Sequence, residues 1–168
     1  MRISSLYKKF IFRCTLKFTV KVAMPKILVL YYSRSGNTEK MAYAVAEGAK
    51  SVANTEIDVE FRVHADDFDR YEAVIVGVPT YHHEAPIDIK RLFEESASKE
   101  MLLKGKVGAA FGSYGWTGEA PKLILEIMKN RFEMKVNEPP LLVKYTPDES
   151  SLQMCRELGK RVSESLIQ

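Results

Sequence analysis

Continuous apolar runs alternate along the chain with segments whose apolar residues recur at helical spacing. Residues 26–32 and 72–78 carry Val, Ile and Leu at successive positions, which is typical of strands buried on both faces of a sheet. Residues 55–63 alternate apolar and acidic positions, which predicts a strand with one exposed face. Two further apolar segments, 106–111 and 140–145, bring the prediction to five strands.

Helical spacing of apolar residues fills the gaps between these strands. The positions are Met41, Val45, Ala49 and Val52 after the first strand, Ile89, Leu92 and Phe93 after Pro86, the segment 119–132, and Leu152 to Leu166 after Asp148. Strands that alternate with helices predict the α/β class, with a doubly wound five-stranded parallel sheet. Such a sheet binds ligands at the carboxyl ends of its strands. We therefore expect functional residues directly after strands one, three and four.

The loop after the first strand is crowded with small polar side chains. It reads Ser33-Arg34-Ser35-Gly36-Asn37-Thr38 and leads into a helix, whose N-terminal N–H groups favour an anion. The pattern predicts a phosphate cradle of mainly neutral donors. The alternative is an ordinary helix start capped by Ser35 or Asn37, although one cap explains only one of these residues.

Several nucleotide and catalytic motifs are missing. There is no Gly-Lys-Ser/Thr P-loop, no G-x-G-x-x-G after the first strand, and no G-x-S-x-G elbow around Ser35 or Ser113. The positions after strands one and three hold serine and proline instead of the acids that a phospho-acceptor domain needs. The phosphate cradle therefore needs another interpretation.

Residues 33–38 resemble the T/S-x-T/S-G-N-T loop that binds the FMN phosphate in flavodoxins, and the resemblance extends over about residues 25–167. The loops after strands three and four are similar to those of the flavodoxin module of A-type flavoproteins. The resemblance implies a flavodoxin-like sheet of order 2-1-3-4-5 with FMN where strands one and three diverge. It implies FMN contacts at Ser33, Arg34, Ser35, Gly36, Asn37, Thr38, Pro79, Thr80, Tyr81, His82, Ser113, Tyr114, Gly115, Trp116 and Gly118.

Aromatic residues in two of these loops are candidate walls for a flat flavin ring. Trp116 is the only tryptophan and lies in a glycine-rich loop, so we expect it to stack on the ring together with Tyr81 and Tyr114. The alternative is that Trp116 anchors its loop by packing on the core. Gly112, Gly115 and Gly118, which we expect in one loop after the fourth strand, would let the backbone approach the ring edge.

The loop after strand three departs from familiar flavodoxins, which usually carry a glycine beside the flavin there. Residues 79–86 contain none, and side chains other than glycine resist positive φ by about 1 kcal/mol or more. The loop also holds His82, His83 and Glu84, but too few other ligands accompany them for a metal site. We expect His82 to contact the flavin, and His83 or Glu84 to face solvent.

Charge divides the chain of 168 residues into two parts. Residues 1–23 carry six basic side chains and no acid, and 19 basic and 22 acidic side chains remain elsewhere, a net charge of −3. We interpret residues 1–24 as a basic extension and residues 25–168 as the FMN-binding domain. The body lacks the basic, aromatic-rich stripe of a nucleic-acid surface. No apolar run approaches the roughly 20 residues of a membrane span.

Two distant cysteines, Cys14 and Cys155, give no disulfide or zinc pattern, so the cytoplasm is the expected compartment. Cys155 is expected to be a small core residue on a helix.

The leading functional prediction is an electron carrier that binds FMN, exchanges electrons with transient redox partner proteins, and is a monomer or weak dimer. It needs no catalytic side chain and no metal. One alternative is an FMN-dependent NAD(P)H:quinone or flavin oxidoreductase, for which no insertion supplies a second substrate pocket. Another is a flavin-free binding module, which the intact phosphate loop disfavours.

Overall fold

The computed structural model describes residues 24–167, so residues 1–23 of the predicted basic extension lie outside the described residues. The described chain alternates strands and helices. Its strands are β1 (Lys26–Tyr31), β2 (Glu56–Glu60), β3 (Ala73–Gly77), β4 (Val107–Tyr114), β5 (Lys135–Val136) and β6 (Leu141–Lys144). Its helices are α1 (Asn37–Lys50), the 3-10 helix η2 (Ala65–Arg70), α2 (Ile87–Ser98), α3 (Glu119–Asn130) and α4 (Glu149–Glu164).

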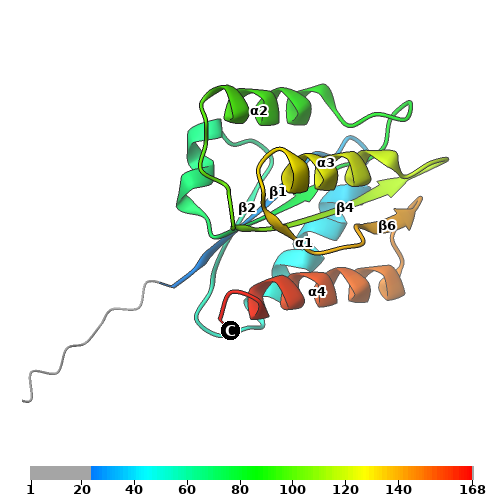
Figure 1. Ribbon diagram of the computed structural model, residues 1–168. Helices are drawn as coiled ribbons and strands as arrows, with labels where there is room; N and C mark the ends of the chain where they lie inside the picture. Colours follow the sequence, from blue (N-terminus) through cyan, green and yellow to red (C-terminus); the bar gives the residue numbers. More distant parts are fainter. Residues whose placement is uncertain (1–23, 168) are drawn as a thin grey trace, which may run out of the picture.

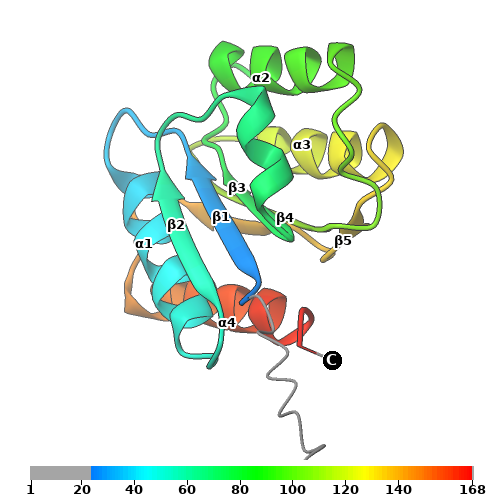
Figure 2. The ribbon, with the colours of Figure 1, turned by 90° about the vertical axis from the view of Figure 1, so that its left-hand side faces the viewer.

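The strands form one parallel sheet of order β2-β1-β3-β4-β5, which confirms the predicted order 2-1-3-4-5, and β6 also pairs with β4. Figure 1 shows α2 and α3 on one face of the sheet and α1 and α4 on the other. In Figure 2, β2 lies beside β1 at one edge of the sheet. No helix in the described part of the chain has the length and apolar character needed to cross a membrane.

Each face of the sheet has its own apolar core. Leu28, Leu30 and the alternate residues of β3 pack against η2, α2 and α3. Ile27, Val29 and their neighbours pack against α1 and α4. Cys155 is fully buried in the second core, as predicted, and burial raises the pKa of its thiol to about 12.

Two strand boundaries differ from the prediction. β4 continues to Tyr114, so Gly112 lies inside a strand and not in a loop. A Cβ at position 112 would collide with the carbonyl oxygen of Val78, so this glycine serves a close approach of two strands. The fifth strand is split, with β5 beside the start of β4 and β6 beside its end.

Helices α1 and α4 lie in close contact through two glycines. A Cβ at Gly48 would collide with the carbonyl of Arg156, and a Cβ at Gly159 would collide with the carbonyl of Val45. Both obstacles are backbone atoms, which no side-chain rotation can move. The absence of a side chain at these two positions therefore allows α1 and α4 to pack backbone against backbone.

Replacing Gly48 or Gly159 by alanine is expected to lower the free energy of unfolding by about 2–3 kcal/mol, because the added methyl group overpacks this contact. Gly115→Ala is the matched control, since a Cβ there would meet only the Tyr145 ring, at 3.7 Å. Urea unfolding followed by circular dichroism measures the difference. Equal midpoints for the three variants would contradict the close packing of the two helices.

Candidate functional site

Loop one, residues 33–38, leads from the end of β1 into the first turn of α1. Gly36 is the N-cap with φ of 82°, a left-handed conformation that glycine adopts without strain. Its N–H donates to Ser33 Oγ at 3.0 Å. The predicted alternative, in which Ser35 or Asn37 caps the helix, is wrong, because α1 has no side-chain cap.

Two hydroxyl groups tie loop one to β4. Thr38 Oγ1 and Ser113 Oγ lie 3.1 Å apart, and both side chains are buried. In contrast, the side chains of Ser35 and Asn37 have no hydrogen-bond partner among the described residues, and both line a cavity of about 180 Å³. This cavity is completed by Pro79, Thr80, Tyr81, Ser113, Tyr114, Gly115 and Tyr145. The structure thus brings together residues of all three predicted loops.

Loop two, residues 78–86, closes on itself as a tight hairpin. Tyr81 N donates to Glu84 O at 3.0 Å and Glu84 N donates to Tyr81 O at 2.9 Å. His82 and His83 between them have φ of 48° and 66°, the pattern of a two-residue turn with both central residues left-handed. The loop without glycine therefore does adopt positive φ, at two successive histidines.

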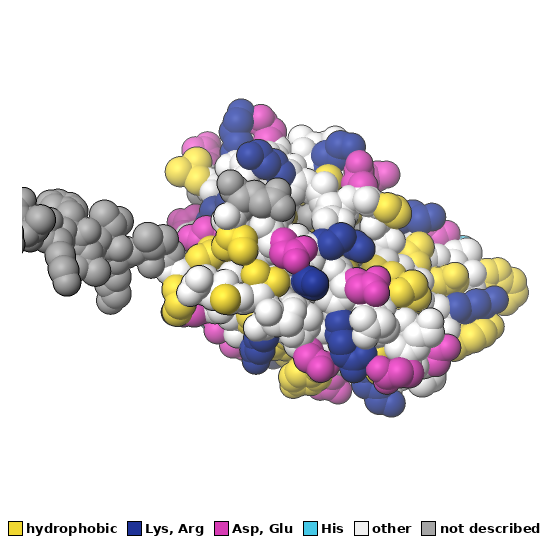
Figure 3. Space-filling model, turned by 90° about the horizontal axis from the view of Figure 1, so that it is seen from below, with side chains coloured by type: hydrophobic (Ala, Val, Ile, Leu, Met, Phe, Trp, Pro, Cys, Tyr) yellow, Lys and Arg dark blue, Asp and Glu magenta, His cyan; other side chains and the backbone are white. Residues whose placement is uncertain are grey.

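Loop three, residues 115–118, presents Trp116 to solvent. The side chain is 91% exposed, so the alternative that it anchors the loop against the core is wrong. Tyr145, which lies beside Gly115, is 62% exposed. In Figure 3, which views the α1 and α4 face, apolar side chains gather at the right-hand end of the molecule. Exposed aromatic side chains at a concave site are typical of a surface that binds a flat ligand or a partner.

A clasp of polar side chains joins loop two to the start of α3. His83 Nδ1 lies 3.1 Å from Glu119 Oε1 and 3.0 Å from Thr117 Oγ1. Hydrogen bonds from Thr117 and then from His83 hold the pKa of the Glu119 carboxyl below its usual range. The expectation that His83 or Glu84 faces solvent holds for both side chains, although His83 also contacts Thr117 and Glu119, and Glu84 pairs with Lys90 at 2.7 Å.

Gly118 and the glycine at 115 have different surroundings. The space beside Gly118 is filled by Leu142 and Tyr114, whereas Gly115 borders the cavity and meets only Tyr145. His82 lines a second small cavity of about 190 Å³ with Thr80, His83, Trp116 and Thr117. Among residues 24–167 no group of three or more His, Cys, Asp or Glu side chains is placed to hold a metal ion.

The sequence did not single out Tyr145, which closes the cavity from the end of β6. Its N–H donates to Tyr114 O at 2.7 Å, and Lys144 Nζ lies 5.2 Å from its ring centroid. We expected functional residues only after strands one, three and four, and so did not consider the residue after the last strand. The aromatic side chain of Tyr145 at that position could have indicated a role in the site.

Arg34 does not point into the cavity with its neighbours. Its guanidinium carbon lies 5.5 Å from the centroid of the Tyr81 ring, a cation–π arrangement. Burial raises the pKa of Tyr81 above its ordinary value. The guanidinium of Arg34 therefore packs on the Tyr81 ring of loop two and does not line the cavity.

A doubly wound parallel sheet with a loop of small polar residues leading into a helix at its switch point is typical of a nucleotide-binding α/β protein. A family model for flavodoxin matches residues 29–159. The chain therefore belongs to the flavodoxin family, whose cofactor is FMN.

Individual relatives agree with this assignment. A flavodoxin from the domain Archaea is 36% identical, with a TM-score of 0.78, covering 85% of this chain and 99% of that one. A type A flavoprotein of Rhodobacter capsulatus is 31% identical over 83% of this chain and 33% of its own length. An anaerobic nitric oxide reductase flavorubredoxin of Escherichia coli is 31% identical over 88% of this chain and 32% of its own length. The chain spans about a third of these curated relatives and resembles their flavodoxin-like module.

The strained turn of loop two gives a prediction for stability. His82→Val is expected to lower the free energy of unfolding by about 1–2 kcal/mol, because a β-branched residue tolerates positive φ poorly. His82→Asn is the matched control, since asparagine is favoured at this turn position, and it should leave the free energy unchanged or raise it. Thermal unfolding of both variants without cofactor measures the effect. Equal melting temperatures would show that position 82 does not need a left-handed conformation.

Proposed function

We propose that this chain binds a single FMN non-covalently and carries electrons between redox partner proteins. The observation that supports this most is the donor set of loop one, where Ser35 and Asn37 have no partner among the described residues and border a cavity. The first N–H groups of α1 lie beside them and have no carbonyl of their own helix to bind. These residues fit a phosphate monoester that carries negative charge.

In this proposal the FMN phosphate binds loop one, through Ser33, Ser35, Gly36, Asn37 and Thr38, with Arg34 contributing its backbone. Thr38 and Ser113 hold the base of that loop through their buried hydrogen bond of 3.1 Å. Neutral donors suit this role because they bind an anion without placing a cation beside the flavin.

The flavin ring would lie between loops two and three. Trp116 and Tyr114 form one wall, and Pro79, Thr80, Tyr81 and His82 form the other. The open space beside Gly115 leaves room for the ring edge, whereas Gly118 serves mainly the packing of Leu142. FMN, when bound, supplies the ability to accept and release electrons, and the protein positions it and limits its access to water. No side chain is needed as acid, base or nucleophile.

The proposal concerns an electron-carrying module, because the chain matches only about a third of the curated relatives. The reduction of nitric oxide that one relative's name states is not proposed for this chain. We further propose that the protein acts in the cytoplasm as a monomer or weak dimer with transient partners. Nothing in the described residues favours a stand-alone NAD(P)H oxidoreductase, and rapid oxidation of NADPH by the purified protein would contradict our proposal.

The purified protein is expected to be yellow, or to become yellow with added FMN, and to release one equivalent of FMN on denaturation. Absorbance and fluorescence of the released flavin measure the stoichiometry. A folded protein that stays colourless with excess FMN would refute the proposed function.

Asn37→Ala is expected to weaken FMN binding tenfold or more, because a hydrogen bond to a charged group contributes about 1.5–3 kcal/mol. Arg34→Ala should weaken it less, since its guanidinium lies over the Tyr81 ring. Ser51→Ala, which removes a hydroxyl at the far end of α1, is the control. Quenching of FMN fluorescence gives the dissociation constants. A larger loss for Arg34→Ala than for Asn37→Ala would show that the phosphate is bound mainly by charge.

A further inference from the structure

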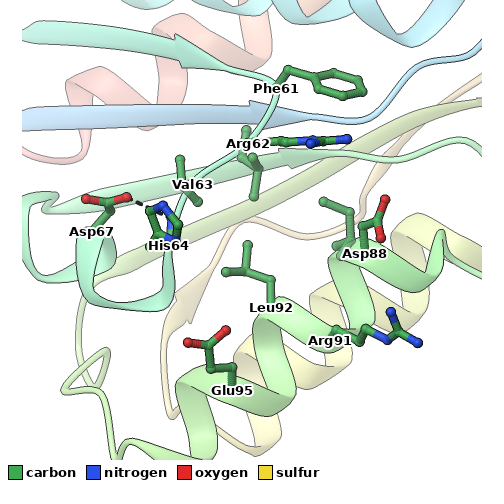
Figure 4. Close-up of a pocket in the computed structure, with 11 residues that line it drawn as sticks. Phe61, Arg62, Val63, His64, Asp67, Asp88, Arg91, Leu92 and Glu95 are labelled. Atoms are coloured by element: carbon green, nitrogen blue, oxygen red, sulfur yellow. Dashed lines mark hydrogen bonds between the residues drawn. The ribbon is translucent and has the colours of Figure 1, made fainter.

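An open groove of about 590 Å³ lies between the end of β2 and α2. We call it the α2 groove (Figure 4), and it lies outside loops one, two and three. Its floor is apolar and consists of Leu30, Val63, Ile89 and Leu92. Phe61 forms one wall and is 39% exposed. The proposed function leaves this groove without a role.

The acids at one end of the α2 groove already have partners. Asp67 accepts from the backbone N–H of His64 at 2.8 Å and from Arg70 at 2.7 Å. Glu95 pairs with Lys99 at 2.9 Å. Asp67 is thus paired within the molecule, whereas Glu95 shares Lys99 with Asp66, which lies 3.0 Å from the same ammonium group.

The other end of the α2 groove carries two guanidinium groups. Figure 4 shows the side chains of Arg62 and Arg91 pointing to the same side, with Asp88 between them. Neither arginine has a carboxylate within salt-bridge distance among residues 24–167, and Arg62 lies 5.8 Å from the centroid of the Phe61 ring. This end of the groove therefore offers more positive than negative charge.

Aromatic contacts connect the α2 groove to the proposed flavin site. The Phe61 ring stacks on Tyr32 with centroids 5.6 Å apart, and Tyr32 meets Tyr81 edge-on at 6.5 Å. Tyr81 belongs to loop two, and Arg34 lies over its ring. A molecule seated in the groove would thus touch a continuous surface that reaches loop two and includes a third unpaired arginine.

We propose that the α2 groove is a docking surface for an acidic redox protein, which places an apolar side chain on the groove floor and carboxylates on Arg62 and Arg91. This inference rests on the proposed function, because it names the class of partner. An apolar centre with a polar, charged rim is the anatomy of a protein–protein interface. The open shape suits a protein better than a small molecule, which binding sites usually enclose on most sides.

The net charge of −3 outside the first 23 residues gave no reason to expect an acidic partner. Local charge decides the orientation of an encounter when the charges lie within about one Debye length, about 10 Å at 0.1 M salt. At the end of the groove that carries Arg62 and Arg91, the only lining carboxylate among the described residues is Asp88, so this end keeps a local excess of one positive charge.

The test is calorimetric titration of a plant-type two-iron ferredoxin, an acidic redox protein, into the FMN-loaded protein at low salt. Wild type should bind it, with an affinity that falls as salt rises. The double variant Arg62→Glu/Arg91→Glu should bind at least tenfold more weakly. The control double variant Arg131→Glu/Arg161→Glu carries the same charge change at the C-terminal ends of α3 and α4 and should stay within about twofold of wild type.

Val63→Phe tests the groove without a change of charge. The larger side chain fills the floor of the groove and should also weaken ferredoxin binding. An absence of ferredoxin binding by wild type, equal losses in both double variants, or tighter binding of the basic protein cytochrome c would overturn the inference. Flavin absorbance of every sample, together with a parallel titration of FMN-free protein, distinguishes a failure of FMN binding from a failure of ferredoxin docking. A protein that binds no FMN refutes the proposed function, whereas FMN-loaded variants with unaltered ferredoxin binding refute only the docking surface.

Discussion

The winding of the chain about β1 determines where every functional group lies. From β1 the chain crosses to β2 on one side and then returns past β1 to β3 on the other side. Because parallel crossovers are right-handed, these two connections cover opposite faces, α1 with α4 and η2 with α2 and α3. The loops after β1 and β3 therefore diverge, and the space between them receives the N-terminus of α1. The topology alone, before any side chain is considered, predicts a ligand site at this edge of the sheet.

The order and type of most elements could be predicted from the sequence, because buried strands require apolar residues. Strands covered on both faces must be apolar throughout, and the runs around Val29 and Ile75 made both strands recognisable. Loop one was recognisable because it holds more polar groups than a turn requires. The extent of β4 was not, since Gly112 looks like a loop residue until the carbonyl of Val78 is seen beside it. A close approach between strands distant in sequence has no local pattern.

The hairpin of loop two shows a second limit. A loop without glycine is expected to resist positive φ, yet His82 and His83 both adopt positive φ. The local cost is real, about 1 kcal/mol or more for each residue, so contacts elsewhere must offset it. The paired backbone bonds between Tyr81 and Glu84 supply part of the compensation. The clasp from His83 to Thr117 and Glu119 supplies another part, and its partners lie more than thirty residues away in the sequence.

The clasp is built from exposed groups, and an exposed polar contact alone adds little stability. Its value lies in geometry. His83 lies in loop two, and Glu119 is the first residue of α3, directly after loop three, so their contact joins loop two to the segment that carries loop three. Thr38 and Ser113 do the same for loop one through a buried hydrogen bond. A site held at both ends requires less ordering on binding, and a small local strain at His82 is compatible with that gain.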